Sequence, residues 1–167
     1  MPARSGVRAS GAAREPVARG RWLPPRSLLD VNVWVAVLDD AHQFSNLANA
    51  FIETSGLTIA TCPLVENAVI RIMGMPSYGR GGGLPLQRVR ARLQEACQSL
   101  DHTFWADNVS LRDDSLVDFS RVQGHQQVTD LYLLALAVHH GGRLVTFDRS
   151  VALSSVRGAS EMHLLVL

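Results

Sequence analysis

The chain has 167 residues, of which 47% are hydrophobic, so it has the size and the apolar content of one globular domain. All 16 basic residues are arginines. The absence of lysine excludes a P-loop nucleotide site, which needs a Gly-Lys-Ser/Thr motif, and Schiff-base chemistry, which needs a lysine amine. The formal net charge of +1 is the sum of two parts of opposite charge. Residues 1–26 carry six arginines and one glutamate, whereas residues 27–167 carry ten arginines and fourteen acids and are therefore acidic.

Residues 1–26 are rich in arginine, alanine, glycine and proline and end near the pair Pro24-Pro25, which blocks a continuous helix. We expect a disordered arm. It lacks the apolar stretch of a secretory signal. Its composition leaves open an organellar transit peptide or a segment without a role in the fold.

The two cysteines, Cys62 and Cys97, show no metal-binding or disulfide spacing, so we expect buried thiols in a reducing compartment. The longest apolar run, residues 131–138, is far shorter than the roughly 18 to 20 residues of a membrane-spanning helix. These features predict a soluble, cytoplasmic protein with no membrane association.

From residue 27 onward, short apolar runs alternate with segments of helical periodicity, which is typical of βαβ units around a parallel sheet. The sequence therefore predicts an α/β fold with a mainly parallel central sheet. The expected strands are 27–29, 57–60, 102–105, 143–147 and 162–167. The expected helices are 31–38, 43–55, 63–73, 86–100, 113–119 and 130–140, the last capped by Thr129, and a glycine-rich loop is expected over 75–85.

Four acidic residues stand against apolar runs rather than in solvated segments. Asp30 ends the first predicted strand and Asp148 follows the strand RLVTF. Glu66 and Asp130 lie near the starts of two predicted helices and share the apolar faces of those helices. Because functional groups gather beyond the carboxyl ends of parallel strands, we expect these four side chains to converge at one edge of the sheet.

Four ionised carboxylates need a cation, because each raises the pKa of its neighbours. Oxygen ligands favour a hard ion such as Mg²⁺ or Mn²⁺. Taken singly, each acid has an ordinary alternative: Asp30 as a helix cap, Glu66 as a solvated or paired acid, Asp130 as a first-turn helix acid and Asp148 as a turn former. The ordered set, with each acid beside an apolar run, favours the metal site.

The segments LLDVNVWVAVLD, CPLVENAVIRI and QQVTDLYLLALAVHHGGRLVTFDR closely resemble the PIN-domain ribonucleases, and in particular the VapC-type toxins of bacterial type II toxin–antitoxin pairs. The resemblance covers about residues 27–167 and implies a three-layer α/β/α fold. It also implies a Mg²⁺- or Mn²⁺-dependent endoribonuclease that forms a homodimer and is neutralised by a cognate VapB-type antitoxin.

The resemblance places the four catalytic, metal-binding acids at Asp30, Glu66, Asp130 and Asp148. It places accessory polar groups at Asn32 and Thr146, which we expect to orient ligands or water. The arginine-rich arm and the glycine-rich loop have no counterpart in the motif, so no role is transferred to them.

RNA must approach an acidic domain, so exposed arginines are candidates for phosphate contacts: Arg80, Arg88, Arg90, Arg92 and Arg149. An ordinary solvated helix face is the alternative for the group. Three aromatic residues, Trp34, Phe104 and Trp105, are expected to pack in the core rather than to stack on bases.

Two rival functions stay open. A catalytically degenerate PIN-like module would bind RNA or a protein without cleaving it, although the presence of all four acids argues against this. A phosphoryl-transfer domain of the haloacid-dehalogenase or receiver type also places an aspartate after its first strand, but such domains need a lysine, and this chain has none.

Overall fold

The computed structural model describes residues 24–167, and its sheet has five parallel strands in the order β3-β2-β1-β4-β5. The strands are β1 (Ser27–Leu29), β2 (Thr58–Thr61), β3 (Asp101–Phe104), β4 (Arg143–Thr146) and β5 (Leu164–Val166). The helices are α1 (Val31–Leu38), α2 (Ser45–Ile52), α3 (Pro63–Met73), α4 (Leu86–Ser99) and α5 (Val128–His139). The predicted α/β class with a parallel sheet is confirmed.

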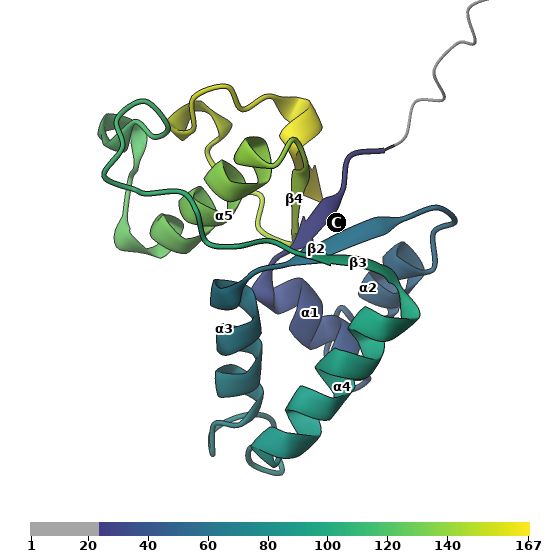
Figure 1. The fold of residues 1–167 in the computed structure, drawn as a ribbon. Helices are drawn as coiled ribbons and strands as arrows, with labels where there is room; N and C mark the ends of the chain where they lie inside the picture. The colour runs from purple at the N-terminus through teal and green to yellow at the C-terminus, as the bar shows by residue number, and fades with distance from the viewer. Residues whose placement is uncertain (1–23) are drawn as a thin grey trace, which may run out of the picture.

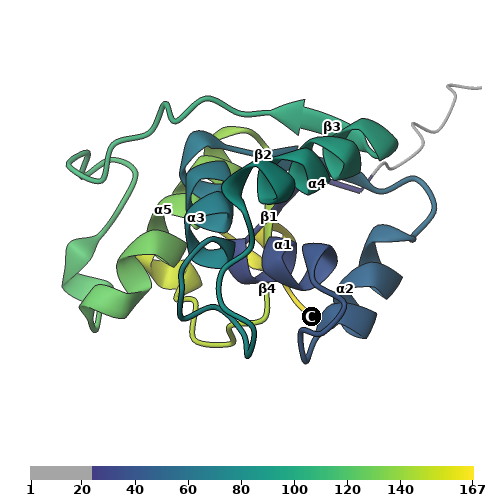
Figure 2. The same cartoon turned by 90° about the horizontal axis from the view of Figure 1, so that it is seen from below.

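The helices form two layers around the sheet (Figure 1). Helices α1 to α4 lie on one face, and α5 lies on the other, which the view from below also shows (Figure 2). The central strand β1 is buried along its whole length, and Leu28 and Leu29 are completely inaccessible to solvent. A strand with both faces covered must be apolar throughout, which explains the unbroken run that the sequence shows there.

The segment before β1 corrects one predicted boundary. Residues 1–23 of the expected arm lie outside the described residues, but Arg26 belongs to the folded domain. Its Nη1 donates hydrogen bonds to the carbonyl oxygen of Ile59 (2.9 Å) and to both the carbonyl (3.0 Å) and the carboxylate (3.0 Å) of Asp101. This guanidinium therefore joins the segment directly before β1 to β2 and to the edge strand β3.

Three further predictions were wrong. Residues 113–119 form turns rather than a helix, because the Asp113 carboxylate accepts a hydrogen bond from the Ser115 amide (2.9 Å) and so closes a local turn. Helix α5 begins at Val128, directly after a 3₁₀ turn, so Thr129 lies inside the helix and does not cap it. Phe104 is 53% exposed, because β3 is an edge strand, whereas Trp34 and Trp105 are buried as expected.

Gly142 allows the closest approach between the start of β4 and its neighbours. A Cβ atom at this position would lie 2.5 Å from Cη2 of Trp105 and 2.6 Å from the carbonyl oxygen of Arg26. We expect Gly142→Ala to lower the free energy of unfolding by about 1–3 kcal/mol, since overpacking forces rigid neighbours to move. Urea denaturation measures this change. Gly81→Ala is the matched control, because a Cβ there meets nothing within 4 Å, and equal stability of the two variants would contradict the prediction.

Candidate metal-binding and nuclease site

Three aspartates gather at the carboxyl edge of the sheet, and each is placed there by a different element. Asp30 follows β1 and caps α1, and its Oδ1 accepts a hydrogen bond from the Val31 amide (2.6 Å). Asp148 follows β4 after one residue, and Asp130 lies in the first turn of α5. Because all five strands are parallel, the ends of β1 and β4 lie at the same edge.

Thr146 holds two of these aspartates in place. This completely buried side chain donates a hydrogen bond from its Oγ1 to Oδ2 of Asp30 (3.1 Å) and accepts one from the Asp148 amide (3.0 Å). The carboxylate of Asp148 accepts a further hydrogen bond from the Ser150 amide (2.6 Å). The hydroxyl of Thr146 thus links the ends of β1 and β4, and its role in orienting metal ligands or water stays a prediction.

The carboxyl groups repel one another in a poorly solvated setting. Asp30 is only 5% exposed, and burial raises its pKa above the ordinary value, with a smaller contribution from the charge of Asp148. Burial, followed by the charges of Asp30 and Asp148, raises the pKa of Asp130 to about 6. The pKa of Asp148, by contrast, is lowered, because the amide and hydroxyl of Ser150 stabilise its exposed carboxylate.

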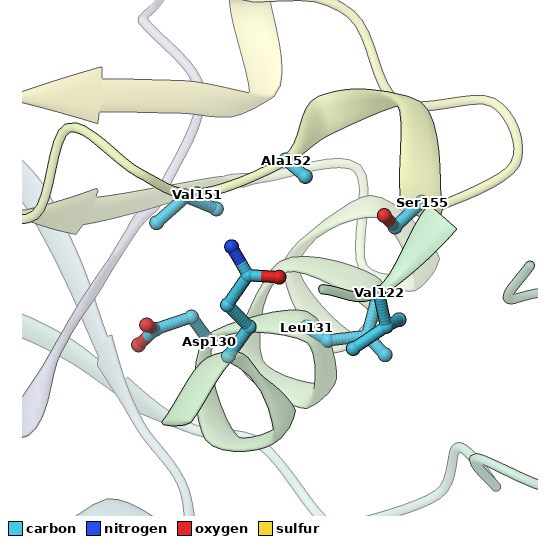
Figure 3. Close-up of a pocket in the computed structure, with 7 residues that line it drawn as sticks. Val122, Asp130, Leu131, Val151, Ala152 and Ser155 are labelled. Carbon is cyan, nitrogen blue, oxygen red and sulfur yellow. The ribbon is translucent and has the colours of Figure 1, made fainter. Parts of the chain in front are cut away.

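The apolar surroundings of Asp130 explain why burial raises the pKa of its carboxyl group. Asp130 borders a small pocket whose walls include Val122, Leu131, Val151 and Ala152. Figure 3 shows the Asp130 carboxylate pointing away from Leu131 and Val122, while Val151 lies on the opposite side of the pocket from the helix. Apolar residues therefore exclude water from one side of the Asp130 side chain, and its carboxylate oxygens point away from Leu131 and Val122.

Glu66 faces a different part of the edge. It lies in the first turn of α3, and its Oε1 accepts a hydrogen bond from Oγ1 of Thr61 (2.7 Å). It lines a cavity of about 400 Å³ between α3, α4 and β3, together with Arg90, Cys97 and His102. The charges of Asp30 and Asp148 act on Asp130, whereas the charge of Glu66 acts on His102 and Cys97 and favours higher pKa values there. Whether Glu66 joins the three aspartates as a ligand stays a prediction.

The donor set at the edge fits a hard divalent cation. In the described part of the chain, none of the three aspartates forms an ion pair with an arginine or histidine. Within residues 24–167, no group of three or more acidic, histidine or cysteine side chains is already arranged to hold a metal ion. Mg²⁺ usually takes one or two carboxylates and completes its shell with water and substrate phosphate, so a site with fewer than three protein ligands in place is compatible with this ion.

The remaining predicted residues lie around this edge or away from it. Asn32 is exposed in the first turn of α1, two residues from Asp30, and Arg149 is exposed beside Asp148. Arg92 donates a hydrogen bond to the carbonyl oxygen of Leu38 (2.9 Å), at the opposite end of α1 from Asp30. Arg80, in the glycine-rich loop, lines a cavity with residues 39–43, which also follow α1. Arg88 is exposed on the first turn of α4.

Three polar residues near the edge escaped the sequence analysis. Thr61 lies within hydrogen-bonding distance of both His102 and Glu66. Burial, with a smaller contribution from Asp107 shortly after β3, raises the pKa of the Cys62 thiol to about 11. The only sequence signal for Thr61 is its position at the junction of a strand and a helix, and the pairing of β2 with β3 that positions His102 is a property of the folded sheet.

The fold and this edge together define the class of protein. The sequence matches the PIN domain family over residues 27–157, and the chain belongs to that family. Among curated proteins, it is 42% identical to Ribonuclease VapC44 of Mycobacterium tuberculosis over 146 residues, which cover 85% of this chain and 99% of the relative. It is 37% identical to Ribonuclease VapC39 of the same organism over 137 residues, or 81% and 98% of the two chains.

Ribonuclease VapC38 of Mycobacterium tuberculosis is also 37% identical, over 145 residues that cover 84% of this chain and 99% of the relative. The identification of the chain as a VapC-type PIN protein is therefore confirmed. No helix within residues 24–167 is long and apolar enough to cross a membrane.

Proposed function

We propose that the chain is a Mg²⁺- or Mn²⁺-dependent endoribonuclease of the VapC type, the toxin of a toxin–antitoxin pair. The observation that carries the proposal is the cluster of Asp30, Asp130 and Asp148, in which burial and mutual repulsion raise the pKa of two carboxyls. The ribonuclease names of relatives that match most of the chain support the choice of RNA as substrate.

Asp30, Asp130 and Asp148 would hold the ion, and Glu66 would bind it directly or through water. A divalent cation held there would supply Lewis-acid stabilisation of the phosphodiester and would lower the pKa of a bound water molecule. The composition is consistent with such a cation, since the chain has no lysine and arginine is its only permanently charged basic side chain.

The protein's own residues orient the reacting groups. Thr146 fixes the carboxylate of Asp30 and the backbone of Asp148, so that these two ligands have little freedom. Burial of Asp30 keeps bulk water away from one side of the site and strengthens its electrostatic interactions. The raised pKa of Asp130, about 6, reflects a carboxylate whose charge is opposed by burial and by the charges of Asp30 and Asp148, and a bound cation would relieve this opposition.

The test is cleavage of a labelled single-stranded RNA by the purified chain, with and without Mn²⁺. We expect cleavage with Mn²⁺ and none after chelation by EDTA. Binding of the RNA without cleavage in Mn²⁺ would instead establish the catalytically degenerate module and overturn the proposal. DNA of the same sequence serves as the control for substrate class.

Arg90 is the arginine that we expect to contact the RNA backbone, because it lines the same cavity as Glu66. Arg90→Ala should weaken RNA binding and lower the slope of log affinity against log salt by about 0.7, the value for one phosphate contact on a single strand. Arg88→Ala, two residues away and outside this cavity, should change the slope less. Fluorescence anisotropy at several salt concentrations measures both, and a larger effect of Arg88→Ala would contradict the assignment.

Two partners follow from membership in the VapC group: a cognate VapB-type antitoxin that covers the acidic edge, and a second copy of the chain. Inhibition of RNA cleavage by the co-purified antitoxin tests the first. Sedimentation equilibrium of the chain alone tests the homodimer, which predicts twice the monomer mass of 18.2 kDa.

A further inference from the structure

A completely buried hydroxyl links Glu66 to a histidine on the neighbouring strand. Oγ1 of Thr61 lies 2.7 Å from Oε1 of Glu66 and 2.7 Å from Nε2 of His102. Thr61 is the last residue of β2, and His102 lies in β3 opposite Ile59. Side chains two residues apart on a strand share a face of the sheet, so the pairing of β2 with β3 brings the imidazole to the hydroxyl.

The protons in this chain of contacts can be assigned by counting. A threonine hydroxyl has one proton, and here it is donated to the carboxylate of Glu66. The contact with His102 must then be a hydrogen bond that the hydroxyl oxygen accepts, so Nε2 of His102 carries a proton. Burial lowers the pKa of His102, which leaves the neutral ring protonated at Nε2 and unprotonated at Nδ1.

This arrangement restricts the carboxylate of Glu66. Its Oε1 accepts the hydrogen bond of Thr61, whereas its Oε2 has no hydrogen bond within the described residues and stays available to a water molecule or an ion. The hydroxyl in turn is restricted by His102, which the strand register holds in place. Without the two hydrogen bonds, Glu66 would rotate on the exposed first turn of α3.

We propose that Thr61 and His102 are positioning residues that hold Glu66 in one orientation at the catalytic edge. Their importance for RNA cleavage rests on the proposed function, whereas the orientation of Glu66 does not. Groups that orient a metal-binding or catalytic side chain in this way typically change activity by about ten- to a hundredfold when they are removed.

The experiment uses paired substitutions in the full chain. Thr61→Val keeps the shape but removes the hydroxyl, and Thr61→Ser keeps the hydroxyl. His102→Ala removes the donor, and His102→Gln restores an N–H at a similar distance. Thr58→Val, at the other end of the same strand, is the control for a threonine-to-valine change in β2.

For cleavage of RNA, we expect Thr61→Val to lower kcat about tenfold with KM within about twofold of the wild type, and Thr61→Ser to retain most of the activity. His102→Gln should be more active than His102→Ala, and Thr58→Val should match the wild type. Thermal denaturation of each variant identifies loss of folding. A folded Thr61→Val variant with wild-type kcat would overturn the proposal.

Two NMR measurements test the orientation without reference to activity. Nitrogen-15 shifts of His102 should report the Nε2–H tautomer, and three-bond couplings to Cγ of Glu66 should report one χ1 rotamer in the wild type and averaging in Thr61→Val. Unchanged couplings, or an Nδ1–H tautomer, would overturn the proposal. If the wild type does not cleave RNA but the couplings change as expected, the proposed function fails and the positioning of Glu66 stands.

Discussion

Asp30→Asn should reduce the RNA-cleaving activity of the chain by about a hundred- to a thousandfold, the scale on which one main electrostatic group at a reacting centre acts. The substitution removes the negative charge from the most buried of the three aspartates. It keeps an oxygen that accepts the hydrogen bond of the Val31 amide, and asparagine is as good a helix cap as aspartate. The variant should therefore stay folded while it loses its activity.

The rate of cleavage under single-turnover conditions in Mn²⁺ measures the loss, and circular dichroism checks the fold. Asp40→Asn is the matched control, because Asp40 is exposed and lies beyond the far end of α1. Comparable activity of Asp30→Asn and Asp40→Asn would remove Asp30 from the mechanism.

Asp130→Asn should abolish cleavage and also make the metal-free protein more stable at pH 7.5. The pKa of Asp130 is about 6 in the folded chain, against an ordinary value of 3.8. A carboxyl with a raised pKa binds its proton more tightly in the folded state. It therefore contributes stability below about pH 4, and this contribution is lost as the pH rises from about 4 to about 6.

Above pH 6, the ionised Asp130 opposes folding. The full shift corresponds to about 3 kcal/mol, and since the group is only half buried, we discount this to about 1–2 kcal/mol. Asp130→Asn should recover this free energy at pH 7.5 and flatten the stability curve between pH 4 and 6. Urea denaturation in EDTA at several pH values measures the effect. A variant that is less stable than the wild type at pH 7.5 would contradict the account.

Much of the fold could be predicted because its three central strands, β1, β2 and β4, are buried. The unbroken apolar run at Leu28-Leu29 and the helical spacing of Leu133, Leu134 and Ala137 each admit one interpretation. The predictions failed where local hydrogen bonds decide the structure. The turn at Asp113 depends on one side-chain bond to an amide, and such bonds leave no periodic signal.

The candidate site was predictable to a similar degree. Asp30, Asp130 and Asp148 could be found because a carboxylate next to an apolar run must be compensated. The sequence could not show that Glu66 interacts with Thr61 and His102. This link depends on which strands are neighbours in the sheet. The hydrogen bond from Arg92 to the carbonyl oxygen of Leu38 likewise depends on the position of α4 relative to α1 and could not be predicted from the sequence.

Binding of Mn²⁺ to the purified chain tests the central claim most directly, because it asks whether the three aspartates hold a divalent cation. Electron paramagnetic resonance of free Mn²⁺ gives the affinity for the wild type, Asp30→Asn, Asp130→Asn and the control Asp40→Asn. We predict saturable binding at pH 7.5 that is at least about tenfold weaker in Asp30→Asn and Asp130→Asn and unchanged in Asp40→Asn. Equal affinity of all four proteins would contradict the assignment of this edge as the metal site.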